Sequence, residues 1–586
     1  MRAPLAALCV LLGSIVAHAQ DGPPAGMPAF DAFERARAVV RGDESGAAAA
    51  AVWGAAVTVR GATEARRAST MEFDAARVGI VEELARHVSG DAGPLTVELA
   101  GRPVPIPAGP LSSVALSIAP GVDAVAVLVG DRSGVVFPEE MLARGLLPSE
   151  AIELALRRAL DDRLPPAVEP GFDAWSGYAG RVVREGEATV FRAPVTVLAT
   201  LGDGGAPTLL HRGGRVVPLS AITPGGLEAW AAQMAAHLRG RLHDGLDPWG
   251  LRGTLDARRG AFLSPVDEPF AQALAAYALL RYGSRAWADP DRAAASRRAG
   301  EVVLRQLGFV TPVRAGLLAD VPDAPLEPAP WADTGAAAMA LVALGELDED
   351  AIVAHPELVD LRDRCAGRVR SAVGATLTGE IAFEPSVRAN QRALVARALA
   401  ALGDSGVGRP NDAELGRAAG ESILATVETE LLVGQLPWLL GVIEATPEQA
   451  EALGVVRSLI WTHQLDDLDA AGPDRDMAGG IVFTRGGTPL PTWQSARAVV
   501  AASGMLADPR LVPAEARAGE FFRLMRSLRF LRQLSADETL GHLYADPDLA
   551  LGGVRAALWD QRMPSAATSL ALLAVCDALD VAYGVR

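Results

Sequence analysis

The sequence predicts a mainly α protein in which a smaller α+β domain precedes a C-terminal (α/α)6 toroid, a ring of six helix pairs. Three observations lead to this fold class. A Gly-Gly pair is followed at one fixed distance by a proline that opens an alanine-rich helix, once from Gly480 to Pro491 and once from Gly553 to Pro564. Two kinds of helix alternate after residue 225. Between 96 and 225, apolar segments with β-branched residues are separated by turns.

The first residues, "MRAPLAALCVLLGSIVAHAQ", have the layout of a secretory signal. Arg2 supplies the positive charge, residues 5–16 form the apolar run, and Ala17-His18-Ala19 is an A-x-A cleavage site. The apolar run is too short to span a bilayer. The sequence therefore predicts a signal peptide over 1–19 and an exported protein, periplasmic or extracellular, whose mature chain has no transmembrane segment.

Residues 20–95 begin with a Pro/Gly-rich linker, "DGPPAGMP", and continue with helical segments such as "VGIVEELARHV". Residues 96–225 predict an α+β domain. In it one hairpin turns at "GDRSG" and a second at "GDGGAP", and between them "SEAIELALRRALDDRL" carries its apolar residues at helical spacing.

Residues 226–586 predict twelve helices of two kinds. One kind is amphipathic and rich in Arg, at about 226–243, 292–307, 357–372, 412–427, 447–464 and 513–533. The other is almost uncharged and rich in Ala and Leu, at about 269–281, 334–345, 389–402, 435–444, 493–506 and 564–579. A helix that is apolar on all sides is buried, whereas a charged stripe faces water. An inner ring within an outer ring satisfies both patterns, and each pair needs its neighbours to bury its apolar face. An irregular helical domain or an open solenoid is the alternative.

Gly-rich loops that lead into Ala/Leu-rich helices in about six pairs resemble the squalene cyclase and protein prenyltransferase superfamily of α/α toroids. The resemblance concerns the repeat pattern of 226–586 and does not extend to the catalytic motifs. Cyclases of that group use a D-x-D-D acid, and the nearest string here, "LDDLDA", has another order and follows an outer helix. Prenyltransferases bind zinc through Asp, Cys and His, and neither mature Cys has such surroundings. Isoprenoid chemistry is therefore not expected, whereas other toroids act on carbohydrates as hydrolases, lyases or epimerases.

Length, net charge and the content of Cys and His exclude several classes of partner and site. The chain has 586 residues, more than one ordinary core accommodates, and a formal net charge of −17, which argues against nucleic acid as a partner. After signal cleavage only Cys365 and Cys576 remain. Both lie in apolar helical contexts that favour burial over pairing, although a single disulfide stays open. The His residues have no metal-ligand spacing, so no metal and no cofactor is expected.

The loops before the inner helices converge on one face of such a ring, where the helix N-termini favour polar or anionic ligands. Asp333 and Glu268 are the candidate general acid and base. The candidate substrate-binding residues are Trp331, Arg388, Trp438 and Trp493. Indole rings stack on sugar rings, and an arginine holds anionic or hydroxyl-rich groups. The alternative roles are packing for the Trp residues and helix capping for the acids.

Two function classes remain open at this point. One is an exported enzyme that acts on a glycan or another polar polymer in the toroid cavity. The other is a non-catalytic binding or scaffolding protein of the cell envelope. No G-x-S-x-G, Walker or dinucleotide-binding motif selects another chemistry.

Overall fold

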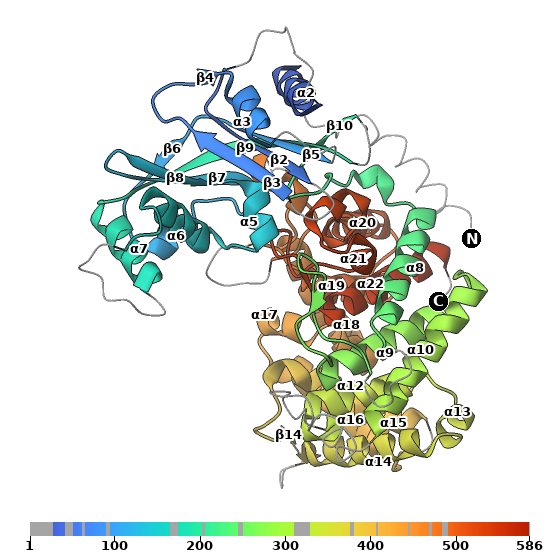
Figure 1. Ribbon diagram of the computed structural model, residues 1–586. Coiled ribbons are helices and arrows are strands. Elements are labelled where there is room, and N and C mark those ends of the chain that lie inside the picture. Colours follow the sequence, from blue (N-terminus) through green and yellow to red (C-terminus); the bar gives the residue numbers. More distant parts are fainter. Residues whose placement is uncertain are drawn as a thin grey trace.

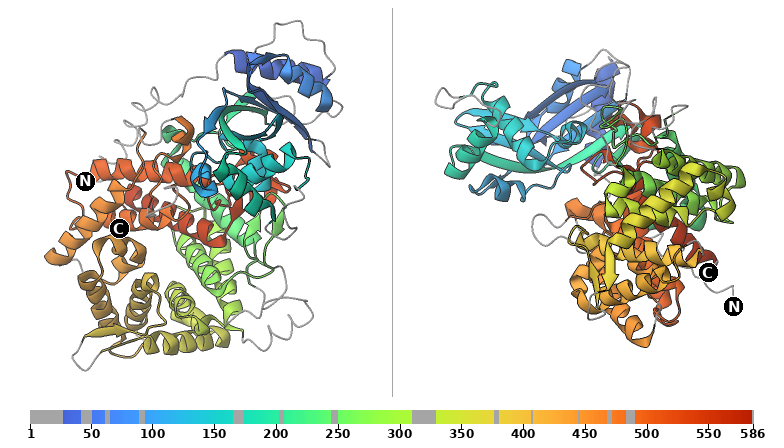
Figure 2. Two further views of the ribbon diagram at one scale, coloured as in Figure 1. Left: turned by 90° about the vertical axis from the view of Figure 1, so that its left-hand side faces the viewer. Right: turned by 90° about the horizontal axis from the view of Figure 1, so that it is seen from below.

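A β-rich region formed by the N-terminal part of the chain lies against a larger helical part (Figure 1; Figure 2). The computed structural model describes residues 27–41, 51–60, 65–88, 94–164, 174–201, 206–243, 250–309, 329–375, 380–405, 408–443, 446–467, 472–482 and 490–584. The protein is mainly α with this additional β-rich region, as the sequence predicts at that level of detail. The expected signal peptide, 1–19, lies outside the described residues.

The β-rich region is built on an eight-stranded antiparallel sheet with the path β3-β2-β5-β9-β7-β8, in which β6 and β10 also pair with β9. Its strands are β2 Gly54–Arg60, β3 Ala65–Met71, β5 Leu95–Ala100, β6 Val104–Ile106, β7 Asp123–Val129, β8 Arg132–Val136, β9 Thr189–Thr200 and β10 Pro207–Leu210. The long strand β9 joins the two halves, because residues 195–199 pair with β5 and residues 189–194 pair with β7. Both predicted hairpins are confirmed as the pairs β7–β8 and β9–β10.

Strands β2 and β3 lie in the segment for which the sequence predicts a linker and helices, and that expectation is wrong for them. The edge strand β3, "ARRASTM", is mostly exposed or half-buried, so it lacks the apolar run that marks a buried strand. The helices of this region are α2 Met27–Arg41, α3 Ile80–Val88, α4 Leu111–Ala115, α5 Pro138–Arg144, α6 Pro148–Ala159 and α7 Ala174–Glu185. Of these, α3 packs on β2 and β3, and α6 packs on β7 and β8.

Eleven of the twelve helices expected after residue 225 are present. The Arg-rich ones are α8 Pro224–Gly240, α10 Pro290–Gly308, α14 Pro356–Ser371, α16 Asp412–Thr426, α18 Pro447–Thr462 and α20 Arg517–Leu534. The Ala/Leu-rich ones are α9 Pro269–Gly283, α12 Thr334–Leu344, α15 Arg392–Asp404, α19 Ser495–Ala507 and α22 Ser565–Tyr583. Shorter elements join them: β11 Leu255–Asp256, β12 Ala261–Phe262, α13 Glu349–Val353, α17 Thr429–Leu432 and α21 Pro547–Ala550.

The twelfth expected helix, 435–444, is not an α-helix. Two short 3-10 turns, η4 Val433–Gln435 and η5 Trp438–Gly441, stand in its place. Pro437 lies between them and disfavours the helical conformation of the residue before it, so a continuous helix cannot pass through this point. The two turns still bring Trp438 and Leu439 into the buried core.

The apolar helices contact one another in sequence. Helix α9 packs against α12 and α22, α12 also packs against α15, and α22 also packs against α19. The turn η5 contacts both α15 and α19. All residues of α12 and almost all of α22 up to Asp580 are buried. Helix α22 is long and apolar enough to cross a membrane, but 83% of that stretch is buried inside the fold, as in the core helix of a folded domain.

Three helix-to-helix connections share one geometry. A residue one or two positions after an Arg-rich helix forms an isolated antiparallel bridge with a residue of the following loop, in the pairs Leu242–Leu251, Gln464–Ile481 and Ser535–Val554. In two of them the backbone N–H of that loop residue then donates to a hydroxyl fourteen positions further on. Ile481 bonds to Ser495 at 3.1 Å, and Val554 bonds to Thr568 at 3.0 Å. The repeated Gly-Gly motif therefore corresponds to a repeated structure.

The first glycine of each Gly-Gly pair, Gly479 or Gly552, has the same structural role in both loops. Gly479 and Gly552 adopt positive φ angles of 87° and 78°, which favour glycine. An added Cβ would meet the backbone carbonyl of Arg526 in α20 at the first position and of Gln233 in α8 at the second. The loop before α22 thus packs closely against α8, the first Arg-rich helix. In the same way, the loop before α19 packs against α20, the sixth Arg-rich helix.

Helix α20 is more buried than its Arg-rich sequence predicts. Its first half is mostly half-buried or exposed, whereas its second half is mostly buried and contacts the segment that leaves the sheet. Arg529 donates to the carbonyl of Val217 at 2.7 Å, and the Gln533 side chain accepts from the Val217 N–H at 2.7 Å. The β-rich region therefore packs on this face of the helical part.

Cys365 and Cys576 are both free and buried. Burial raises the pKa of each thiol to about 12. The two residues therefore pack as small apolar side chains, which is the role that their sequence context favours.

His237 of α8 should make the stability of the helical part dependent on pH. Burial, assisted by the nearby charge of Arg241, lowers the pKa of His237 to about 3. The unfolded chain binds a proton at this side chain below its ordinary pKa of about 6.5, and the folded chain does not. The free energy of unfolding is therefore expected to decrease as the pH falls from about 6.5 towards 3, by up to about 1.4 kcal/mol per pH unit from this group. Urea unfolding at several pH values measures the slope.

The variant His237→Gln is the control for this pH dependence, because it removes the titrating group and keeps a polar side chain. Its stability should change less between pH 6.5 and 4 than that of the wild type. Equal slopes for the two proteins would show that His237 does not titrate on unfolding.

Candidate functional site

A pocket of about 430 Å³ lies where five of the apolar helices begin. We call it the Glu268 pocket. Its lining comes from the starts of α9, α12, α15, α19 and α22 and from η5: Glu268, Pro269, Phe270, Leu274, Ala329, Asp333, Ala336, Arg388, Asn390, Gln391, Leu394, Trp438, Trp493, Gln494, Arg497, Ala566 and Leu570. Helix N-termini direct free N–H groups and partial positive charge to this place.

The structure brings together five of the six residues that the sequence selects as site candidates. Glu268, Asp333, Arg388, Trp438 and Trp493 all line the Glu268 pocket. The sixth, Trp331, is not part of the lining. Its ring lies instead beneath the guanidinium of Arg364, 4.7 Å from the ring centroid to the guanidinium carbon, which is a cation–π contact.

The two candidate acids have different surroundings. Asp333 caps α12, because its side chain accepts a hydrogen bond of 2.8 Å from the Ala336 N–H. This is the capping role that was the alternative interpretation of the acids. Glu268 precedes Pro269 at the start of α9, is exposed and makes no capping bond with its side chain. Glu268 is therefore the carboxylate that remains available for a ligand.

The neighbouring Asp267 has a structural role, because its carboxylate holds two helix starts together. Its side chain accepts from the Glu268 N–H at 3.0 Å and from the hydroxyl of Ser565, which starts α22. Burial raises the pKa of Asp267, against the opposing charge of Arg241. Asp267 thus ties the start of α9 to the start of α22, while the next residue faces the pocket.

Arg497 is a cation of the pocket that the sequence analysis missed. It donates to the backbone carbonyls of Leu436 at 3.1 Å and Gly434 at 2.9 Å, and burial lowers its pKa. Its signal in the sequence is an arginine inside an otherwise apolar helix, "SARAVVAASGML". Arg388, by contrast, is exposed at the rim. The pocket therefore holds two guanidinium groups and two carboxylates.

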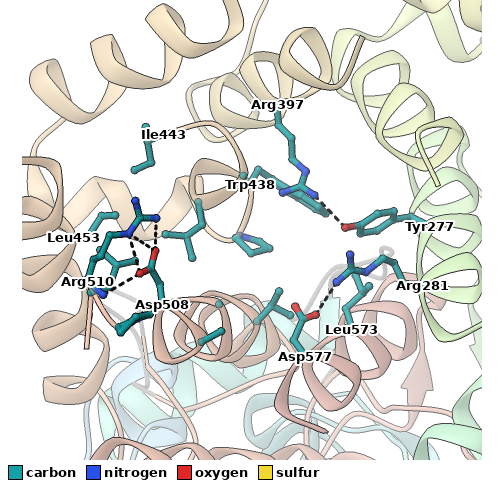
Figure 3. Close-up of a pocket in the computed structure, with 18 residues that line it drawn as sticks. Tyr277, Arg281, Arg397, Trp438, Ile443, Leu453, Asp508, Arg510, Leu573 and Asp577 are labelled. Carbon is teal, nitrogen blue, oxygen red and sulfur yellow. Dashed lines mark hydrogen bonds and ion pairs between the residues drawn. The ribbon is translucent and has the colours of Figure 1, made fainter. Parts of the chain in front are cut away.

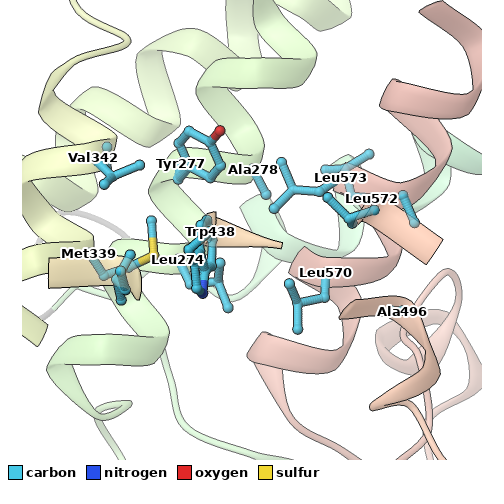
Figure 4. Packing of buried hydrophobic residues seen from close by; sticks show 14 of the residues in the cluster. Leu274, Tyr277, Ala278, Met339, Val342, Trp438, Ala496, Leu570, Leu572 and Leu573 are labelled. Carbon is cyan, nitrogen blue, oxygen red and sulfur yellow. The ribbon is translucent and has the colours of Figure 1, made fainter. Parts of the chain in front are cut away.

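The floor of the pocket is Trp438, which is only 4% exposed. Its ring meets Tyr277 edge to face, with 6.1 Å between the ring centroids. Leu274, Met339 and Leu570 surround it (Figure 4). The Trp438 indole therefore closes the centre of the helical part below the pocket.

Gln391 belongs to the polar lining near α15, and the buried Gln435 supports the start of that helix. The Gln435 side chain accepts from the Ala393 N–H at 3.1 Å and donates to the Ala389 carbonyl, so it satisfies the start of this helix. Gln391 lies over the first turn of α12, where a Cβ on Gly335 would come within 2.2 Å of its amide nitrogen. Glycine at 335 therefore leaves the space that Gln391 occupies.

Two other acids that precede Ala/Leu-rich helices in the sequence, Glu384 and Asp560, form ion pairs with arginines. Glu384 pairs with Arg368 at 3.0 Å, and Asp560 pairs with Arg562. Neither lines the Glu268 pocket. Within the described residues no three His, Cys, Asp or Glu side chains gather as metal ligands do.

Comparisons with known proteins give no family for this chain. No protein-family model matches it, and no curated protein matches it. Among solved structures, one similar chain is an uncharacterized protein from Pyrococcus horikoshii, with 14% identity and a TM-score of 0.24. The match covers 31% of this chain and 93% of the other.

Proposed function

We propose that this chain is an exported α/α-toroid protein that binds an acidic glycan in the Glu268 pocket and cleaves it. The single observation that carries the proposal is the convergence of Glu268, Arg388, Arg497, Trp438 and Trp493 on one pocket of about 430 Å³. This volume lies within the range of small-ligand sites. The expectation of export rests on the signal-like pattern of residues 1–19. N-terminal sequencing of the secreted protein tests it, and the expected first residue is Gln20.

Two features support the toroid. The apolar elements contact one another in a closed order, α9, α12, α15, η5, α19, α22 and again α9. The loop before α22 also packs on α8 as the loop before α19 packs on α20, which is the relation expected where the end of a ring meets its beginning. An open solenoid would leave the first and last repeats apart.

The side chains of the pocket suit a charged sugar unit. Arginine binds a carboxylate through two parallel N–H groups, so Arg388 at the rim and Arg497 deeper inside can hold the carboxylate of a uronic acid. The half-buried Trp493 offers an indole face for a pyranose ring. Glu268 is the acid that is not engaged in capping, so it is the candidate general acid or base, and Asp333 is its candidate partner.

A non-catalytic binding protein of the cell envelope is the second candidate function. One observation favours it: Asp333 is already engaged in capping α12, which leaves Glu268 without a second free carboxylate in the lining. Glycan binding without turnover is the outcome that would select this alternative.

Replacing Glu268 separates the two functions. With an acidic oligosaccharide that the wild type binds, such as an oligogalacturonate or an oligomer of mannuronate, Glu268→Gln should bind with similar affinity. Its turnover should fall by about 10²- to 10⁴-fold, because the proton donor or acceptor is removed. Calorimetry measures binding, and reducing-end and ultraviolet assays of the products distinguish hydrolysis from elimination.

One control variant and one binding variant accompany this experiment. Glu384→Gln removes an acid that pairs with Arg368 outside the pocket and should change neither binding nor turnover. Trp493→Ala should weaken binding by about 5- to 100-fold, as loss of a stacking surface does. If no acidic oligosaccharide bound to the wild type, or if Trp493→Ala bound as tightly, the proposed function would be wrong.

A further inference from the structure

A second pocket, of about 670 Å³, shares Trp438 with the Glu268 pocket and is otherwise lined by different residues (Figure 3). We call it the Tyr277 pocket. It is lined by residues nearer the ends of the apolar helices and by the start of the loop after α19, including Tyr277, Arg281, Arg397, Asp508, Arg510 and Asp577. Pro509 and Arg510 are exposed, so the pocket reaches the surface there. None of the site residues selected from the sequence except Trp438 lies in it.

Most charges in this pocket are already neutralised by one another. Arg281 donates to Asp577 at 2.9 Å, and Arg510 forms a fork with Asp508, with one contact at 2.7 Å. Arg397 is different. It donates to the hydroxyl of Tyr277 at 3.2 Å, and no carboxylate within the described part of the chain forms an ion pair with it. The lining therefore contains three guanidinium groups and two carboxylates, and Arg397 is the guanidinium among them that has no carboxylate partner within the described residues.

The guanidinium of Arg397 is held in place by its neighbours. Tyr277 lies between it and Arg281, whose guanidinium carbon is 5.9 Å from the centroid of the Tyr277 ring (Figure 3). On the opposite side, a Cβ on Gly441 would lie only 1.9 Å from the Arg397 Nη1. The absence of a side chain at Gly441 thus creates the space in which this guanidinium sits.

The remaining wall of the pocket is apolar. It consists of Pro437, Trp438, Leu440, Ile443, Leu453, Val500, Leu511 and Leu573. A fully hydrated ion would gain nothing from such a surface, whereas an apolar body with one charged end would bury its apolar part there.

We propose that the Tyr277 pocket binds a small carboxylate with an apolar body, of the aryl or medium-chain aliphatic class. Arg397 binds the carboxylate through its N–H groups, with the Tyr277 hydroxyl beside it, and the apolar wall receives the rest of the molecule. The nearby ends of the helices carry partial negative charge and disfavour an anion. Selection for the carboxylate therefore depends on Arg397. This site shares only Trp438 with the lining of the Glu268 pocket and does not depend on the proposed glycan function.

The test uses the full-length mature chain and a matched pair of probes, 2-naphthoate and its uncharged analogue 2-naphthamide, with octanoate as an aliphatic probe. Titration calorimetry should show saturable binding of naphthoate at least 10-fold tighter than that of naphthamide. Arg397→Met should weaken naphthoate binding by at least 10-fold and leave naphthamide binding unchanged. Arg388→Met, in the Glu268 pocket, is the control and should leave both unchanged.

A second variant tests the role of Arg397 without replacing it, in case Arg397→Met does not fold. Gly441→Ala keeps Arg397 but displaces its guanidinium, so it too should weaken naphthoate binding, while the thermal unfolding midpoint shows whether each variant is folded. The proposal is overturned if neither naphthoate nor octanoate binds at millimolar concentration, if naphthamide binds as tightly as naphthoate, or if Arg388→Met weakens binding as much as Arg397→Met does.

Discussion

Replacing Arg212 by Ala is expected to destabilise the protein by about 3–5 kcal/mol, because it leaves a buried carboxylate without its counter-charge. Arg212 is only 1% exposed, at the point where the sheet region meets the helical part. Its guanidinium bonds to the fully buried Asp476 and, at 2.7 Å, to Asp474, and its Nε donates to the Pro120 carbonyl at 2.9 Å. Urea unfolding at pH 7 measures the loss.

Acidification should weaken the ion pair between Arg212 and Asp476 and so lower the free energy of unfolding. Burial opposes ionisation of Asp476, but the charges of Arg212 and His211 outweigh it and hold the pKa of that carboxyl well below its usual range. The folded state therefore favours the ionised form. The contribution of Asp476 to stability is present above the ordinary carboxyl pKa of about 4 and is lost as the pH falls towards the lower folded value.

Two comparison variants make the Arg212 prediction specific. Arg215→Ala removes an exposed arginine three residues away and should change stability by no more than about 0.5 kcal/mol. The double variant Arg212→Met with Asp476→Leu removes both charges and should recover much of the loss, since the cost lies in the unpaired charge. An Arg212→Ala protein as stable as Arg215→Ala would show that the contact does not join the two parts.

The helices of this protein could be predicted well because their patterns are local. Residues 334–344 contain no charge, and the structure buries all of them. The first strands could not be predicted, because β3 is an edge strand that gains its place from pairing with β2 and not from its own apolar residues. The same holds at 433–441, where distant side chains fix the path of the chain: Arg497 binds two of its carbonyls.

The candidate site shows the same division. Glu268, Asp333, Arg388 and Trp493 could be selected because each precedes or begins an apolar helix. Trp331 meets that criterion too, yet its ring turns to Arg364, and nothing local distinguishes it from Trp493. Arg497 and Arg397 were missed because an arginine in an apolar helix is informative only once the facing loop or tyrosine is known.

Replacing Trp438 by Ala should have the second large effect, on stability and on both pockets at once. The indole lines the Glu268 pocket and the Tyr277 pocket, and it is 4% exposed. Its loss removes the packing of Tyr277 and Leu274 and leaves a cavity that joins the two spaces. A cost of about 3–5 kcal/mol is expected for a buried Trp-to-Ala change, measured by urea unfolding.

Free indole provides the decisive control for this variant. A ligand that binds only the folded protein stabilises it, and indole fits the space that the Trp438 side chain leaves. Millimolar indole should therefore raise the unfolding midpoint of Trp438→Ala by more than it raises that of the wild type. Trp331→Ala, which removes a partly exposed ring beneath Arg364, should cost less and should not respond to indole. If Trp438→Ala were no less stable than Trp331→Ala, the indole would not be the element that closes the centre of the helical part.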